Sequence, residues 1–138
     1  MTKVLTVGVF DMLHYGHFEL FRKARSAGGK RPHLIVAVQE DDVVRNYKPR
    51  AKLVYGWDVR SKMVAELRSV DEVIPYRNVL DLVMDTDFDV FAVGEDQTHT
   101  GFKQAVEFCK QQNRKVVRIP RTKGISTTLL RQRTGRMA

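Results

Sequence analysis

Two histidines three positions apart, His14 and His17, are the residues whose types and spacing most directly suggest chemistry. They follow an apolar run from Val4 to Val9 and precede a helical pattern beginning near Phe18, so they fall where a strand gives way to a helix. A helix N-terminus has unpaired N–H groups and a positive dipole end, which suits a phosphate. Two imidazoles there could each donate a hydrogen bond to an oxygen that gains charge during phosphoryl transfer. The same spacing also fits a metal-binding pair or two surface residues.

The rest of the sequence alternates strand patterns with helical patterns. Short apolar runs predict strands at 4–9, 34–38, 72–75, 90–93 and 116–119. Helices are predicted between the strands. The first runs from Phe18 to a stop at Gly28-Gly29. The second begins near Trp57 with Asp58 as its cap, and its apolar stripe consists of Val59, Met63, Val64 and Leu67. Further helices are predicted over 79–84, around 105–109, and after a cap at Ser126. The polar segment 39–53 predicts a long irregular loop, of the kind that often carries function.

Apolar strands separated by helices are typical of a parallel sheet covered on both faces. We therefore expect an α/β fold, Rossmann-like and doubly wound, with a five-stranded parallel sheet and helices on both faces, in a single domain over 1–138. Ligands of such sheets bind beyond the carboxyl ends of the strands. Polar residues follow those ends: Asp11, His14 and His17, then Lys48, Arg50 and Lys52, then Glu95 and Asp96, then Arg121, Thr122 and Ser126–Thr128. A site is predicted at this edge.

Charge and composition narrow the classes of function. The net charge is +8 and the isoelectric point about 9.9, which fits either nucleic acid or small polyanions as ligands. The basic residues form short clusters rather than one helical stripe with interleaved aromatics, which favours local phosphate sites over nucleic acid. The sequence has no apolar run long enough to span a membrane, so a cytoplasmic protein without membrane insertion is expected. Cys109 is the only cysteine, which excludes an internal disulfide and a cysteine zinc cluster.

Two segments together resemble the signature motifs of the cytidylyltransferase family, and in particular of its bacterial glycerol-3-phosphate enzymes. They are Gly8–Asp11 with His14–His17, and Arg121–Thr128. A third segment, Arg68–Val73, is similar to another block of that family. The resemblance runs from about residue 4 to 130 and is poor at 39–53 and 97–103.

The resemblance implies transfer of CMP from CTP to a small phosphorylated alcohol, most directly glycerol 3-phosphate, with release of pyrophosphate. It implies catalytic roles for His14, His17, Lys48 and Arg121, with Lys52 as the alternative loop lysine. The implied nucleotide-binding residues are Gly8, Val9, Phe10, Asp11, His14, His17, Arg68, Asp96, Arg121, Thr122, Gly124, Ile125, Ser126 and Thr127. Asp11 would orient a histidine or help hold Mg²⁺, and Asp96 would contact the ribose or base. Mg²⁺ is expected as cofactor, bound chiefly by the phosphates rather than by dedicated protein ligands. A homodimer is also implied, with Tyr47, Tyr55 and Trp57 as candidate contacts.

Other interpretations remain open at this point. The acceptor could be phosphoethanolamine or phosphocholine, because the stretch Gly94–Lys103 lacks the tryptophan that glycerol-3-phosphate enzymes typically carry after their fourth strand. The histidine motif reports the reaction and hardly the base, so an adenylyltransferase acting on FMN or a sugar phosphate is a further alternative. A basic nucleic-acid-binding module is the interpretation from a different class.

Overall fold

A computed structural model of the chain describes residues 1–47 and 52–122. Within them, one sheet contains β1 (Thr2–Gly8), β2 (Pro32–Gln39), β3 (Glu72–Tyr76), β4 (Val90–Gly94) and β5 (Lys115–Ile119). The strands lie in the order β3-β2-β1-β4-β5 and every neighbouring pair is parallel. The predicted five-stranded parallel sheet is confirmed. The expected cap at Ser126 and the helix after it lie outside the described residues.

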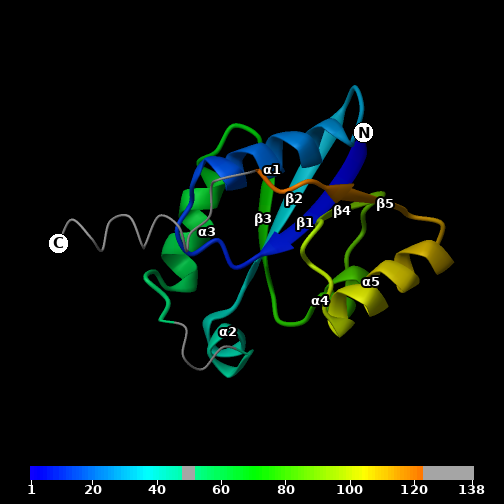
Figure 1. The fold of residues 1–138 in the computed structure, drawn as a ribbon. Coiled ribbons are helices and arrows are strands. Elements are labelled where there is room, and N and C mark those ends of the chain that lie inside the picture. The colour runs from blue at the N-terminus through cyan, green and yellow to red at the C-terminus, as the bar shows by residue number, and fades with distance from the viewer. Residues whose placement is uncertain (48–51, 123–138) are drawn as a thin grey trace.

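Helices cover both faces of the sheet, as the apolar strands require (Figure 1). On one face, α1 (Tyr15–Ser26) and α3 (Trp57–Ala65) pack against alternate strand residues such as Val4, Leu34 and Val36. On the other face, α4 (Val79–Asp85) and α5 (Thr100–Gln111) pack against the intervening ones, such as Leu5 and Phe91. No helix in the described part of the chain is long and apolar enough to cross a bilayer.

The segment 39–53 is not the irregular loop that its polarity predicted, because it contains a short helix, α2 (Asp41–Tyr47). Asp41 and Asp42 lie in its first turn, where carboxylates interact favourably with the positive end of the helix dipole. Val44 is buried, which fixes the helix against the rest of the fold. Among the residues of α2 whose burial is described, Val44 alone is buried, and one buried residue in two turns gives too weak a hydrophobic periodicity to predict a helix.

Part of the expected stripe of the helix α3 is buried and part is exposed. Val64 is fully buried and Leu67 packs against the core, as expected, but Val59 and Met63 are exposed and Arg60 is fully buried instead. The position of the cap was also wrong: the helix begins after Gly56, whose backbone is extended and has no side-chain cap, and Asp58 lies within the first turn. Arg60 is buried where Val59 was expected to be, and hydrophobic periodicity cannot predict the burial of an arginine.

The sheet opens between β1 and β4 at its carboxyl edge. The β1–β2 ladder runs to the strand ends, at Gly8↔Val38, whereas β1 pairs with β4 only at Val4↔Val90 and Leu5↔Phe91. This is where the strand order reverses direction, the place where open α/β sheets bind their ligands.

Candidate active site

A cavity of about 1030 Å³ lies at this opening. Residues of the segment 7–20 form its centre. Residues of 39–53 and 76–80 line what we term the β3 side, and residues of 94–104 and 119–122 line the β5 side. The site predicted at the carboxyl edge therefore corresponds to a real concavity, reached by segments far apart in the sequence.

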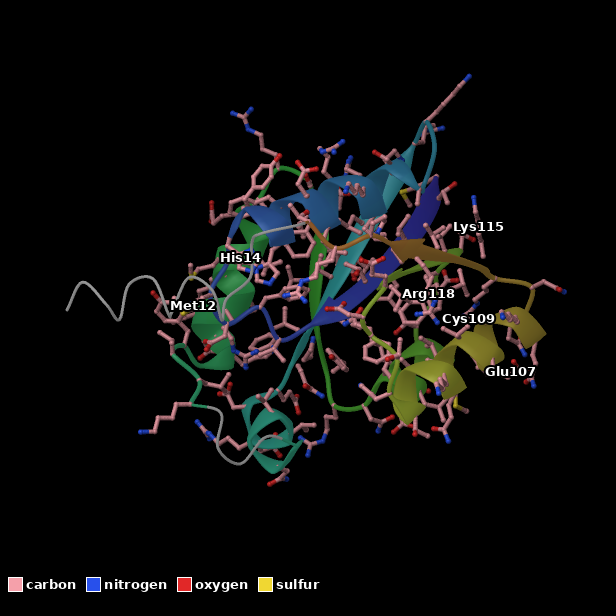
Figure 2. All side chains as sticks on the ribbon, viewed as in Figure 1. Met12, His14, Glu107, Cys109, Lys115 and Arg118 are labelled. Atoms are coloured by element: carbon pink, nitrogen blue, oxygen red, sulfur yellow. The ribbon has the colours of Figure 1, made fainter. Side chains whose placement is uncertain are left out.

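The two histidines stack against each other at the start of α1, with ring centroids 3.9 Å apart and an interplanar angle of 26°. His14 is the N-cap of the helix and His17 lies in its first turn, so α1 begins three residues earlier than the apolar pattern indicated. Both line the cavity. Figure 2 shows His14 on the opposite side of the molecule from the buried free thiol of Cys109 on α5. The stacking brings the two imidazole rings to the same place at the start of the helix.

Hydrogen bonds to the backbone fix which ring nitrogen of each histidine carries the proton. The N–H of Gly16 donates to Nδ1 of His14 at 3.0 Å, and the N–H of His14 donates to Nδ1 of His17 at 3.3 Å. Each Nδ1 is thus an acceptor, so the proton of each neutral ring lies on Nε2. These Nε2–H groups are the ones left to donate to a ligand.

The environment keeps both rings neutral at physiological pH. Burial, and then the positive charge of His14, lower the pKa of His17 to about 4. Burial and the nearby guanidinium of Arg121 lower the pKa of His14. Two stacked imidazoles cannot easily both be charged, and an adjacent cation makes protonation harder still. The pair therefore acts as two neutral hydrogen-bond donors.

The turn before the histidines has a constrained backbone. Phe10 has a φ of 54°, in the left-handed region that a bulky residue seldom adopts. Its ring is buried against His17 and Phe21, with centroids 5.4 and 5.0 Å away. It also covers Gly8, where an added Cβ would lie 2.6 Å from the Phe10 ring. Gly8 and Phe10 thus fit each other, and the packed ring holds the strained turn in place.

Asp11 holds the loop that precedes α3. Its carboxylate accepts hydrogen bonds from the N–H of Val54, at 2.8 Å, and from the N–H of Tyr55, at 2.9 Å. These contacts were not expected from the sequence, and the role of Asp11 in orienting a histidine or holding a metal stays a prediction. Residues 43 and 44 positions away in the sequence supply these donors, so no local pattern could reveal them.

Arg60 does not line the cavity, but it holds residues that do, and the sequence reasoning missed it. Its side chain is fully buried and donates to the carbonyl oxygens of Val9, at 2.8 Å, and Tyr55, at 3.1 Å. It also pairs with Asp41 at the start of α2. Asp41 in turn accepts the N–H of Trp57 at 3.2 Å. The end of β1, α2 and the loop before α3 are therefore tied together by one guanidinium.

The β5 side brings together the predicted residues Asp96, Arg121 and Thr122, which line the cavity. The N–H of Arg121 donates to Glu95 at 2.9 Å, and its guanidinium lies 3.9 Å from the carboxylate of Asp96. Arg121 is more than half exposed, with a side-chain accessibility of 57%. Its charge is therefore available to an anion in the cavity.

On the β3 side, Lys52, Arg77 and Asn78 line the cavity. Arg77 is neutralised by two carboxylates that follow β2, with 2.7 Å to Glu40 and 2.8 Å to Asp42. Arg77 was not among the residues predicted from the sequence. Its position directly after β3, at the ligand-binding edge, is the signal that could have found it.

Arg68 is not brought to the cavity. It lies in the turn between α3 and β3, at the opposite edge of the sheet. The neighbouring carbonyl of Ser69 accepts a hydrogen bond from Arg25, at the far end of α1 from the histidines. Predicted residues that lie outside the described part of the chain are Lys48, Gly124, Ile125, Ser126 and Thr127.

The acidic residues of the site do not form a cage for a metal ion. Within residues 1–47 and 52–122, no three or more His, Cys, Asp or Glu side chains are grouped so as to bind one. Asp11 is engaged with backbone amides, and Asp96 lies beside the Arg121 guanidinium. This donor set does not fit a magnesium ion held mainly by protein carboxylates. It fits one that is carried by the phosphates of a nucleotide.

Comparison with known proteins places the chain among enzymes. The glycerol-3-phosphate cytidylyltransferase of Bacillus subtilis (strain 168) is 36% identical over 96% of this chain and 96% of that protein. The FAD synthase of Thermococcus kodakarensis is 37% identical, over 86% of this chain and 79% of that protein. The crystal structure of a lipopolysaccharide core biosynthesis protein from Thermoplasma volcanium superposes with a TM-score of 0.76 at 26% identity, covering 89% of this chain and 99% of that one.

These similarities confirm a nucleotidyltransferase with a Rossmann-like fold. The family model described as cytidylyltransferase-like matches residues 5–133, which include both motifs and every segment that lines the cavity. The chain therefore belongs to the cytidylyltransferase-like family.

Proposed function

We propose that this protein transfers CMP from CTP to a small phosphorylated alcohol, glycerol 3-phosphate, and releases pyrophosphate. The observation that carries the proposal is the pair of neutral, stacked histidines at the start of α1, with both Nε2–H groups left for a ligand. The glycerol-3-phosphate cytidylyltransferase relative supports the donor and acceptor, because it matches over nearly the whole of both chains.

In the proposed reaction, a phosphate oxygen of the acceptor attacks the α-phosphorus of CTP. The bond from that phosphorus to the bridging oxygen breaks, and pyrophosphate leaves with the electron pair. His14 and His17 donate hydrogen bonds to phosphate oxygens on which charge increases, and because they are neutral they do so without giving up a proton. The start of α1 adds the positive end of its dipole.

Other groups complete the proposed phosphate site. Arg121 and Thr122 bind the triphosphate from the β5 side in this proposal, and Gly124, Ile125, Ser126 and Thr127 of the same motif are assigned to the same role. Lys52 offers a cation from the β3 side, and Lys48 is the alternative lysine. Mg²⁺ is part of the proposal and would neutralise triphosphate charge when bound, held chiefly by the nucleotide.

We further propose a homodimer, as the commonest symmetric assembly. Its support in the structure is the exposed apolar surface of α3 and the loop before it, formed by Val54, Tyr55, Val59 and Met63. Trp57 is partly buried against the core and its Nε1–H donates to the carbonyl of Val38, so it offers less surface for a contact. Light scattering at micromolar concentration tests this, and a monomer mass would contradict it.

A cytoplasmic location, compatible with the buried free thiol of Cys109, belongs to the same proposal.

The function is tested by measuring pyrophosphate release from each of the four nucleoside triphosphates with a panel of acceptors. The panel contains glycerol 3-phosphate, phosphoethanolamine, phosphocholine, FMN and sugar phosphates. We expect turnover with CTP and glycerol 3-phosphate at a kcat/KM of roughly 10⁴ M⁻¹s⁻¹ or more. A preference for phosphoethanolamine or phosphocholine would keep the chemistry and correct the acceptor.

Adenylyl transfer is the second candidate, favoured by the similarity to an FAD synthase. That match leaves about a fifth of the FAD synthase uncovered, whereas the cytidylyltransferase match covers nearly all of its partner. Pyrophosphate release with ATP and FMN, and none with CTP, would establish this alternative in the same assay.

A further inference from the structure

The opening between β1 and β4 is bridged by a single side chain, that of Gln97. The N–H of Gly94, at the end of β4, donates to Oε1 of Gln97 at 2.9 Å. The Nε2 of Gln97 donates to the carbonyl of Val7, near the end of β1, at 3.3 Å. One carboxamide therefore spans two strands whose own ladder has ended at Leu5↔Phe91.

This bridge lies at the floor of the cavity, which Val7, Gly94 and Gln97 all line. On either side the strand ends are secured to their outer neighbours, with β1 paired to β2 through Gly8 and β4 paired to β5 through Gly94. Between them the described residues show no further strand pairing. At this edge the carboxamide therefore joins the two halves of the sheet.

The turn that carries Gln97 also reaches the second motif. The N–H of Gln97 donates to the carbonyl of Gly94 at 3.1 Å, which closes the turn. Within it, Glu95 accepts the N–H of Arg121 at 2.9 Å, and its own N–H donates to the carbonyl of Ile119 at 3.0 Å. Hydrogen bonds, together with the covalent chain of the turn 94–97, therefore link β1, which ends at the histidine turn, to Arg121.

We propose that Gln97 is a positioning residue, which sets the distance between the histidine pair and Arg121 so that both act on one triphosphate. The proposal rests on the function proposed above. Reacting groups must be aligned closely, and a misplacement of about 1 Å can cost up to about 10²-fold in rate. Gln97 acts through Val7 and Gly94 and needs no contact with substrate of its own.

The test replaces Gln97 by Met, which has the same length but no hydrogen-bonding carboxamide. We expect Gln97→Met to lower the single-turnover rate by about 10-fold or more. The Kd for CTP, measured by calorimetry without acceptor, should change by less than about threefold, since the triphosphate ligands remain. Gln111→Met, on the exposed surface of α5, is the matched control and should behave as wild type. A folded Gln97→Met enzyme that turns over within twofold of wild type would overturn the proposal, as would a loss confined to CTP affinity.

A second measurement does not depend on activity. The amide of Gly94 should exchange hydrogen faster in Gln97→Met, because its acceptor is gone. In Gln97→Glu that amide should stay protected, since a carboxylate still accepts from it, while the rate falls because the carboxylate cannot donate to Val7. Unchanged Gly94 exchange in Gln97→Met would overturn the bridge itself. Absence of turnover in the wild type, with Gly94 exchange responding as expected, would instead refute the proposed reaction and leave the bridge standing.

Discussion

The two sides of the cavity are attached to β1 in different ways. The β3 side is attached by charged groups: the fully buried Arg60 binds the Val9 carbonyl and Asp41, and Asp11 binds the amides of the loop before α3. The β5 side is attached by the neutral, half-buried carboxamide of Gln97. Charge-assisted hydrogen bonds are roughly twice as strong as neutral ones. The side-chain contacts that hold the β3 side to the rest of the fold are therefore stronger than the one that holds the β5 side.

The β5 side leaves more of its charge for a ligand. Among the described residues, the Arg121 guanidinium has one carboxylate partner, Asp96 at 3.9 Å, and is mostly exposed, whereas Arg60 is fully buried and paired with Asp41. We therefore expect the β3 side to hold the site rigid and the β5 side to contribute binding energy for a nucleotide. Substitutions on the two sides should consequently separate into effects on stability and effects on nucleotide binding.

The largest effect is expected at the centre, where both sides meet. His14→Ala and His17→Ala should each reduce turnover by about 10²- to 10³-fold, because each removes a preorganised donor to developing charge. Circular dichroism would establish that each variant is folded, and steady-state kinetics would measure the loss. Near-normal turnover in either folded variant would remove that histidine from the mechanism.

On the β3 side, Arg60→Met should lower the free energy of unfolding by about 3 kcal/mol, because it leaves Asp41 and two carbonyl groups without their donor. Urea denaturation measures this change. The matched control is Arg22→Met, which breaks an exposed pair with Glu19 and should leave the free energy of unfolding nearly unchanged. Equal effects of the two substitutions would contradict the view that this side is fixed by buried charge.

Lowering the pH should decrease the free energy of unfolding, because His17 at the centre of the site is neutral in the folded chain. Folding lowers the pKa of His17 from 6.5 to about 4, so between these values the unfolded chain binds a proton that the folded chain does not. Stability is therefore lost as the pH falls through this window, by about 2 kcal/mol for this residue between pH 7 and pH 5. Denaturation of wild type and His17→Asn at both pH values isolates the contribution. An identical pH dependence in the two proteins would show that His17 does not titrate in this way.

The smallest effect is expected on the β5 side. Arg121→Ala should weaken CTP binding by about 10-fold, because it removes a guanidinium that can bind phosphate oxygens. The free energy of unfolding should stay within about 0.5 kcal/mol of wild type, because this guanidinium is exposed and its carboxylate partner among the described residues, Asp96, is 3.9 Å away. Calorimetric titration measures the affinity. Lys115→Ala, an exposed cation at the opposite end of β5, is the control for net charge. If both variants lost CTP affinity equally, a local phosphate contact at Arg121 would be ruled out.

The fold and the histidine turn could be predicted from the amino-acid sequence. Apolar runs separated by helical patterns sufficed for the parallel sheet, because β1, β2 and β4 are buried along most of their length and the edge strands β3 and β5 still carry apolar residues. The histidine turn was equally legible, since the strand, the turn and the helix N-terminus are contiguous. Asp96, Arg121 and Thr122 were found because they directly follow strands whose ends share one edge.

The contacts that hold these parts together are visible in the tertiary structure alone. Asp11 binds the amides of Val54 and Tyr55, which the sequence did not predict, and Arg68, which was assigned to the phosphates, lies at the opposite edge. The contacts of Arg60 with Val9 and of Gln97 with Val7 span 51 and 90 residues. In the sequence, a buried arginine or a bridging glutamine cannot be distinguished from an arginine or glutamine at the solvated surface. What distinguishes them is desolvation and a partner brought close by folding, and neither is encoded in local spacing.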